Sequence, residues 1–117
     1  MSEFKTKHTY EKRAMESRRI LKKYPDRRPI IIEKSNKSNI KNLNKNKYLI
    51  LSDMTAGHLL CYIRKHIDLK PEEAIFIFIN NTLPLISETI SQIYDKNVDN
   101  DGFLYVTYST ESTFGSL

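Results

Sequence analysis

Four short segments rich in β-branched and aromatic residues set narrow limits on the fold of this chain. They span 28–33, 47–51, 74–79 and 103–108. Between the second and the third, apolar residues recur at helical spacing from Ala56 to about Ile67, which predicts a helix with one face on the core. A hairpin followed by a crossover helix and two further strands predicts an α+β domain with a mixed sheet and a helix across one face. The uninterrupted apolar character of 74–79 predicts a central strand.

Two helices are expected before the first strand. Thr9 can cap a helix over 10–24, and Pro25 ends it. Residues 3–8 are expected to form a shorter preceding helix, for which no capping residue is evident. The apolar stripe of the longer helix is expected to contain Tyr10, Ala14, Leu21 and Tyr24.

The first strand and the segment after it carry further signals. Pro29 is expected at the start of its strand or on a sheet edge, because proline has no N–H to donate to a ladder. Segment 35–46 is rich in Lys, Asn and Ser, and only Ile40 and Leu43 interrupt it as apolar anchors. This composition predicts a long exposed connection.

The second half of the chain contains two predicted turns and a short helix. Asn80-Asn81 is typical of a turn. Asn100-Asp101-Gly102 predicts a second turn, which leads into the last strand. Between these turns, Ser87 is expected to cap a short helix that runs through Tyr94.

The composition fits one intracellular domain. The chain has 117 residues, of which 39% are hydrophobic and 28% are charged, and this is the size and mix of a single globular core. Cys61 is the only cysteine, so no intrachain disulfide is possible and a reducing compartment is expected. The longest apolar run, 74–79, is far too short to span a bilayer. We therefore expect any membrane association to be peripheral or covalently acquired.

Charge divides the chain into a basic and an acidic half. Residues 1–47 hold fifteen Lys and Arg against five Asp and Glu, a net charge of +10, whereas the remainder holds four against nine, a net charge of −5. The basic half is suited to acidic peptides, anionic lipid or nucleic acid. A solvated face without a partner explains the same charges.

Residues that match one known family extend along almost the whole chain. The first run is Glu11-Lys12-Arg13, and the second is Lys-Lys-Tyr-Pro-Asp-Arg at 22–27. Further matches are Pro29, Glu33-Lys34, Lys47-Tyr48-Leu49, Ser52-Asp53, Gly57, Ile63-Arg64-Lys65, Phe76, Phe78, Asn80-Asn81, Phe103-Leu104-Tyr105 and Phe114-Gly115. In these residues the chain resembles the GABARAP-like autophagy ubiquitin-like modifiers.

The resemblance implies a fold and a domain organisation. The fold would be a ubiquitin-like β-grasp with a four-stranded mixed sheet and two additional N-terminal helices, which agrees with the element order expected from periodicity. Residues 1–24 would form a helical extension packed on the core, 25–108 the β-grasp domain, and 109–117 a flexible C-terminal tail.

The resemblance also implies a modifier of autophagy and not an enzyme. A processing cysteine protease would cut after Gly115, next to Phe114, and release Ser116 and Leu117. Activating and conjugating enzymes would then pass the Gly115 carboxyl group to phosphatidylethanolamine. The protein would be cytoplasmic before this lipidation and on the autophagosomal membrane after it. No cofactor or metal is implied, and we expect a monomer in solution.

A second implied role is the capture of receptors that carry acidic aromatic-x-x-aliphatic motifs, which would bind by β-augmentation along the exposed edge of the second strand. The aromatic pocket would be formed by Glu16, Ile20, Pro29, Ile31, Lys47, Leu49 and Phe103. The aliphatic pocket would be formed by Tyr48, Ile50, Leu51, Met54, Leu59, Tyr62 and Ile63. The cations assigned to acidic residues flanking the motif are Arg27, Lys45, Lys47, Arg64 and His66.

Three of these positions depart from the family pattern. Leu51 stands where relatives commonly have proline, Leu59 where an aromatic residue is frequent, and His66 where arginine is common. The aliphatic pocket and its peptide preference are therefore expected to differ. A histidine in contact with an acidic peptide would also make binding weakly dependent on pH.

Other interpretations of the same residues stay open. The basic half, with Tyr24 and Tyr48 near cations, also suits a non-enzymatic binding module for anionic membrane, microtubules or RNA, although the chain has no nucleic-acid motif. Most pocket residues equally suit an ordinary core. His58 and Cys61 lie one helical turn apart, but neither nucleophilic nor metal chemistry works with two such groups. The sequence offers no paired carboxylates, phosphate loop or catalytic triad, so no enzymatic activity is expected.

Overall fold

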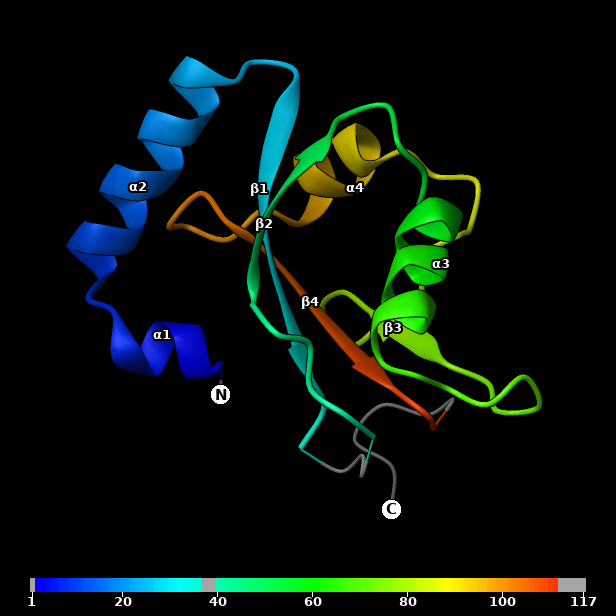
Figure 1. Ribbon diagram of the computed structural model, residues 1–117. Helices are drawn as coiled ribbons and strands as arrows, with labels where there is room; N and C mark the ends of the chain where they lie inside the picture. The colour runs from blue at the N-terminus through cyan, green and yellow to red at the C-terminus, as the bar shows by residue number, and fades with distance from the viewer. Residues whose placement is uncertain (1, 37–39, 112–117) are drawn as a thin grey trace.

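The computed structural model describes residues 2–36 and 40–111 (Figure 1). Its elements follow the expected order: α1 (Glu3–Lys7), α2 (Tyr10–Lys23), β1 (Arg27–Lys34), β2 (Lys47–Leu51), α3 (Ala56–His66), β3 (Phe76–Phe78), α4 (Ile90–Asn97) and β4 (Leu104–Ser109). The residues expected at the processing site, Phe114, Gly115 and Ser116, lie outside the described part of the chain. Within that part, no helix is both long enough and apolar enough to cross a membrane.

The four strands form one mixed sheet in the order β2-β1-β4-β3. β1 pairs antiparallel with β2 and parallel with β4, while β3 pairs antiparallel with β4. In Figure 1, α1 and α2 lie on one side of the sheet, and α3 and α4 lie on the other. The predicted α+β class and the four-stranded mixed sheet are confirmed.

The predicted central strand at 74–79 is wrong in its position. β3 covers only Phe76–Phe78 and lies at an edge of the sheet. The run is apolar because both of its faces are covered: Ile77 packs into the core cluster with α3 and α4, and the next residue, Phe78, is also buried. Successive side chains of a strand point to opposite faces. The apolar run therefore indicates burial on two faces, not a central place in the sheet.

Pro29 lies near the beginning of β1, which is an inner strand. It stands opposite Leu49 of β2, whereas the first residue pair between β1 and β4 is Ile30 with Leu104. Only β2 therefore flanks the strand at Pro29. The missing N–H is tolerated in an inner strand because the proline precedes the parallel ladder.

The two N-terminal helices have side-chain caps. Thr9 Oγ1 accepts a hydrogen bond from Lys12 N at 3.3 Å, which confirms the predicted cap of α2. The Ser2 hydroxyl caps α1 in the same way, through Lys5 N at 3.3 Å. The sequence pattern alone did not predict this second cap.

The buried stripe of α2 differs from the expected one. Tyr10 and Tyr24 are exposed, and the buried residues of the helix are Ala14, Ser17 and Ile20. Of the expected stripe, Ala14 is buried and Leu21 packs at the border of the core. The buried stripe includes Ser17 because α2 packs there against the 101–102 turn: Ser17 Oγ donates to Asp101 O, and a Cβ added to Gly102 would collide with the Ser17 side chain.

Capping boxes begin α3 and α4. Thr55 caps α3, and its N–H donates to Nδ1 of His58 at 3.3 Å, so this histidine has a structural role at the helix start. The predicted cap at Ser87 is wrong, because Thr89 caps α4 instead. Thr89 Oγ1 accepts from Gln92 N at 3.2 Å, and Gln92 Oε1 accepts from Thr89 N at 2.9 Å. This reciprocal pair satisfies two helix-end donors at once.

Both predicted turns are present. Asn80 and Asn81 have φ values of 51° and 63° and close a bridge between Ile79 and Thr82, as a two-residue hairpin turn requires. At 100–102 the backbone turns through Gly102, whose φ is 89°, a conformation that glycine adopts without strain.

Two apolar clusters lie on the two faces of the sheet. The α3–α4 cluster is the larger, and Ile40 and Leu43 of the connection after β1 pack against it as predicted. The α1–α2 cluster contains Phe4, Ile20, Ile31 and Phe103, with Leu49 and Tyr105 at its border. β2 contributes side chains to both clusters. The candidate site is therefore expected along this strand.

Candidate functional site

The candidate site is built around β2, the edge strand that lies between α2 and α3 (Figure 1). Its side chains alternate between the two clusters. Leu49 packs against the α1–α2 cluster, whereas Tyr48 and Ile50 belong to the α3–α4 side. The two predicted pockets therefore lie on opposite faces of one exposed strand.

The residues predicted for the aromatic pocket come together in space. Ile20, Ile31 and Phe103 are buried side by side in the α1–α2 cluster, and Leu49 lies half-buried at its border. Pro29 is also buried. These residues come from α2, β1, β2 and the position just before β4, so the sheet pairing and the packing of α2 assemble them.

An ion pair crosses from α2 to β2 beside this cluster. Lys47 Nζ donates to Glu16 Oε2, and both side chains are partly exposed. Both residues were predicted for the aromatic pocket. In this conformation the predicted pocket is closed, because Ile20, Ile31 and Phe103 are at most 3% exposed. An incoming aromatic side chain would have to displace the half-buried Leu49 and Lys47.

Phe4 is a member of this cluster that sequence analysis missed. Its ring meets the Phe103 ring edge-on, with centroids 5.2 Å apart, and its N–H donates to Glu33 Oε2 at 2.9 Å. α1 thereby packs against the cluster from the N-terminal side. The sequence signal for this contact is an aromatic residue, Phe4, in the first turn of a helix that Ser2 caps. The predicted helix over 3–8 has no evident cap, so this signal is missed.

Asp101 holds Phe103 in place and was likewise not predicted. Its side chain is fully buried, and it accepts hydrogen bonds from Arg13 Nε at 2.7 Å, Phe103 N at 2.8 Å and Tyr105 Oη at 2.5 Å. The hydrogen bond to Asp101 raises the pKa of Arg13. Burial, followed by the hydrogen bond that the Tyr105 hydroxyl itself donates to Asp101, raises the pKa of Tyr105. Asp101 is thus paired with Arg13 and hydrogen-bonded to Phe103 and Tyr105 in the buried cluster.

The residues predicted for the aliphatic pocket also converge, although at different depths. Tyr48, Leu59 and Ile63 are buried in the α3–α4 cluster. Ile50, Met54 and Tyr62 are partly buried against it. Leu51 is exposed at the end of β2. On this face, buried side chains are therefore bordered by partly buried and exposed ones that a ligand could contact.

Two of the five predicted cations are turned toward backbone carbonyl groups. Arg64 donates from Nη1 to Glu73 O at 2.7 Å and from Nη2 to Lys70 O at 3.3 Å. Arg27 Nη1 lies 3.5 Å from Leu49 O. The Arg64 guanidinium thus braces the segment that follows α3.

Two further cations lie close to β2 itself. Lys47 is the partner of Glu16, as described above. Lys45 Nζ lies 4.9 Å from the centre of the Tyr48 ring, a favourable cation–π distance. The Tyr48 hydroxyl donates to Lys45 O at 2.9 Å. Burial, together with the nearby Tyr62, raises the pKa of Tyr48, so this phenol stays neutral.

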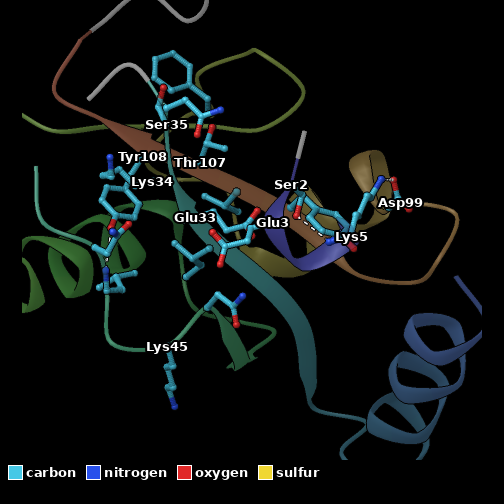
Figure 2. A pocket seen from close by; sticks show the side chains of 18 of the residues that line it. Ser2, Glu3, Lys5, Glu33, Lys34, Ser35, Lys45, Asp99, Thr107 and Tyr108 are labelled. Carbon is cyan, nitrogen blue, oxygen red and sulfur yellow. Dashed lines mark hydrogen bonds and ion pairs between the residues drawn. The ribbon is translucent and has the colours of Figure 1, made fainter. Parts of the chain in front are cut away.

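A cavity of about 1100 Å³ lies apart from these pockets (Figure 2). Mostly polar and charged residues from α1, β1, the 42–46 segment, β4 and the end of α4 line it, with a few apolar ones such as Ile32 and Val106. Lys45 is the one predicted binding residue among its lining. Figure 2 shows Lys5 reaching across to Asp99, at 2.7 Å. Glu33, also in the lining, accepts from Phe4 N. These groups satisfy one another, so the candidate site is placed on β2, where apolar side chains lie beside an exposed strand edge.

Residues that suggested nucleophilic or metal chemistry are not assembled for it. Cys61 is exposed on α3, and the His58 ring is engaged in the helix cap. Among residues 2–36 and 40–111, no group of three or more His, Cys, Asp or Glu side chains is placed to hold a metal ion.

The four-stranded mixed sheet, its helices and the exposed β2 edge define a ubiquitin-like β-grasp protein. The profile of a family described as "Autophagy protein Atg8 ubiquitin like" matches residues 12–115. The chain therefore belongs to the Atg8 family of ubiquitin-like autophagy proteins, which are modifiers rather than enzymes.

Relatives match over almost their whole length. Autophagy-related protein 8c of Arabidopsis thaliana is 51% identical over 114 residues, covering 97% of this chain and 96% of the relative. Autophagy-related protein 8 of Vanderwaltozyma polyspora is 53% identical over 116 residues, covering 99% and 98%.

Solved structures agree with the fold. The crystal structure of Trypanosoma brucei ATG8 matches with a TM-score of 0.89 and 41% identity, and covers 98% of this chain and 99% of that one. Plasmodium falciparum Atg8 in complex with a Plasmodium falciparum Atg3 peptide also matches with a TM-score of 0.89, at 32% identity, and covers 97% and 100%.

Proposed function

We propose that this Atg8-family protein binds acidic aromatic-x-x-aliphatic peptides as an added strand along β2. The observation that carries the proposal is the position of β2 at the sheet edge, with one apolar cluster on each of its faces. An added strand would gain affinity from backbone hydrogen bonds and specificity from alternate side chains. Leu49 and Ile50, adjacent on β2, would separate the aromatic pocket from the aliphatic one.

Residues predicted for both pockets have roles in this proposal. The aromatic anchor would enter between Leu49 and Lys47 and rest on the buried base that includes Phe103. The aliphatic anchor would rest between Ile50 and Met54. Acidic residues of the peptide would compete with Glu16 for Lys47, so their charge would mainly affect the association rate and its salt dependence.

The Plasmodium falciparum complex supports a peptide-binding role. That Atg8, which shares 32% identity and the fold with this chain, was solved with a peptide of Atg3. By analogy, a conjugating enzyme of this kind is the first partner proposed for the present protein, and receptors with acidic motifs are the second. Competition between two such partners for β2 would follow from a shared site.

We further propose that the tail is processed and lipidated. Water would hydrolyse the Gly115–Ser116 bond in a cysteine protease, releasing Ser116-Leu117 and leaving the Gly115 carboxylate. With ATP, an activating enzyme would adenylate that carboxylate and release pyrophosphate, and its thiol would then displace AMP to form a thioester. The thiol of a conjugating enzyme would displace the first thiol and take over the acyl group. The amine of phosphatidylethanolamine would then displace the thiol of the conjugating enzyme and form an amide. The folded part, proposed as the 25–108 domain with the 1–24 extension, would thereby be anchored to the autophagosomal membrane through the 109–115 tail.

The groove proposal is tested with a fluorescent acidic Trp-x-x-Leu peptide and the variant Leu49→Arg. The arginine would place a charge in the apolar cluster and block the strand edge, so binding should fall at least tenfold. Leu85→Arg is the matched control, because Leu85 is 68% exposed on the loop before α4. Equal binding by the parent and Leu49→Arg would refute the groove assignment.

The same titration separates this proposal from a general basic binding module. A module that binds phosphate groups would lose affinity steeply as salt rises and would ignore the peptide. A groove would keep most of its affinity in salt, since its anchors are apolar. Binding of RNA or of anionic vesicles in place of the peptide would favour the alternative.

The processing proposal is tested by intact mass after incubation with a cognate family protease. The expected product lacks the mass of Ser116-Leu117, and Gly115→Ala should abolish its formation. An uncut chain, under conditions that cleave another Atg8-family precursor, would contradict this step.

A further inference from the structure

A row of aromatic side chains leads from β2 to the end of α3. The Tyr48 and Tyr62 rings meet edge-on, with centroids 5.7 Å apart and planes at 79°. Tyr62 then stacks on His66, with centroids 4.1 Å apart and planes at 26°. Tyr48 is buried, Tyr62 is half-buried and His66 is exposed. The row therefore connects the base of the predicted aliphatic pocket to a ring that reaches solvent.

The hydrogen bond of His66 determines which of its nitrogens carries the proton. Nδ1 lies 2.8 Å from the backbone oxygen of Tyr62. A carbonyl oxygen only accepts hydrogen bonds, so Nδ1 must be the donor. In a neutral imidazole the other nitrogen is then unprotonated. The Nε2 atom of neutral His66 is consequently a hydrogen-bond acceptor.

A hydrogen-bond acceptor at this position is the opposite of the donors that an arginine would supply there. A guanidinium has five N–H donors and no acceptor, and it favours a carboxylate partner. The nearby Arg64 does not restore that preference in this conformation, because its two terminal nitrogens donate to Glu73 O and Lys70 O. Lys45, at the other end of the row, lies over the Tyr48 ring.

We infer that His66 makes the α3 end of the groove select a peptide residue with a hydroxyl or amide donor, such as serine or asparagine, over one with a carboxylate. The inference rests on the proposed function, since it assigns a specificity residue to that groove. It also replaces the expectation that His66 acts as a cation toward acidic flanks. The stack on Tyr62 fixes the ring plane, so the acceptor points in a defined direction.

The first test is independent of any peptide. Long-range ¹H–¹⁵N correlation spectra of the full chain at pH 8 report which imidazole nitrogen is protonated. We expect the resonance of Nε2 of His66 to be that of an unprotonated nitrogen, and that of Nδ1 to be that of a protonated one. His58 and His8 serve as internal comparisons. The opposite tautomer, or a charged ring at this pH, would overturn the inference.

The second test measures specificity with a matched set of peptides. An acidic Trp-x-x-Leu peptide is varied to serine, asparagine, aspartate or alanine, one position at a time, at the three positions after its leucine. At the position opposite His66, serine or asparagine should bind the parent about 2- to 10-fold more tightly than aspartate, the range of one net hydrogen bond. His66→Arg should reverse this order, whereas Lys65→Arg should leave it unchanged.

The outcomes separate the two proposals. If Leu49→Arg binds every peptide as the parent does, the groove itself is wrong. If Leu49→Arg abolishes binding while the parent and His66→Arg rank the peptides identically at all three positions, the groove stands and the role of His66 is refuted. An alanine peptide that equals the serine and asparagine peptides throughout would refute it equally.

Discussion

Arg13 and Asp101, which are 88 residues apart in sequence, form an almost fully buried ion pair, with Nε 2.7 Å from Oδ2. Nη1 of the same arginine donates to His8 O at 2.6 Å and contacts Lys5 O at 3.3 Å. The pair thereby joins the α1–α2 junction to the turn before β4. Because Asp101 also binds Phe103 N, the N-terminal helices and the aromatic cluster share one anchor.

Breaking this pair should strongly destabilise the protein. Asp101→Ala would leave the buried Arg13 guanidinium without its partner, and removal of one member of a buried pair costs about 3–5 kcal/mol. Equilibrium unfolding in urea measures the loss. The control is Lys7→Ala, which removes the exposed Lys7–Glu3 pair and should change stability by less than about 1 kcal/mol. Similar losses for the two variants would show that the buried pair contributes no more than a surface one.

Phe4 should matter far more than the length of α1 suggests. Phe4→Ala would remove a buried ring from its contact with Phe103 and should cost about 3 kcal/mol or more. Met15→Ala offers a comparison on the neighbouring helix, because Met15 is 64% exposed and its truncation should be nearly neutral. Thermal and urea unfolding of both variants give the measurement. A neutral Phe4→Ala would mean that α1 is not docked in solution.

Gly102 should not tolerate a side chain. Its φ of 89° is strained for any other residue, and an added Cβ would collide with the side chain of Ser17. Gly102→Ala should therefore lose about 1–3 kcal/mol of stability from the backbone conformation, with a further loss from the clash. Gly57→Ala is a graded comparison, because its Cβ would meet the backbone oxygen of Ile86 at 3.2 Å, a tight contact, but its φ is not positive. It should therefore cost less stability than Gly102→Ala. If both variants unfold at the parent's urea concentration, the close packing of α2 on this turn is not real.

Acid should weaken the attachment of α1 through Asp99. Burial alone would raise the pKa of Asp99, but hydrogen bonds from Lys5 and from the backbone of Asp101 outweigh it, so the pKa is lowered. A lowered pKa means that the carboxylate stabilises the fold above the ordinary aspartate pKa of about 3.9, and that this stabilisation is lost as pH falls below it.

Asp99→Asn should therefore reduce stability at pH 7 and flatten its decrease between about pH 4 and pH 2. Urea unfolding across this range is the measurement. Asp95→Asn, on the exposed side of α4, is the control and should keep the slope of the parent. A slope that is unchanged in Asp99→Asn would place the acid-sensitive group elsewhere.

Capping and turn residues predicted most helices and turns correctly. These predictions failed where a contact between residues distant in sequence determined the backbone conformation. Thr9 and the Asn80-Asn81 turn depend on atoms a few residues away, so their roles followed from the sequence. The cap of α4 did not, because Ser87 and Thr89 are both suitable residues. The bridge between Thr55 and Thr89 fixes the backbone so that Thr89 occupies the capping position.

The same contrast holds for the candidate site. The resemblance to a known family supplied the positions of both pockets, and the structure brings Ile20, Leu49 and Phe103 together. It could not supply the state of the cations, since Lys47 has an ion-pair partner on α2 and Arg64 braces its own loop. Such pairings depend on how helices and strands pack against one another, and short sequence patterns do not specify this packing.

The order of helices and strands, the turns at 80–81 and 100–102 and membership of the Atg8 family followed from the sequence alone, because each depends on residues close together or on a pattern along the whole chain. The edge position of β3, the packing of Phe4 on Phe103 and the ion pair of Arg13 with Asp101 became evident only in the folded protein. These relationships arise from the strand pairing, in which β4 lies parallel to β1 and between β1 and β3. This pairing brings residues 30–34 and 104–108 side by side and so sets which side chains are buried together.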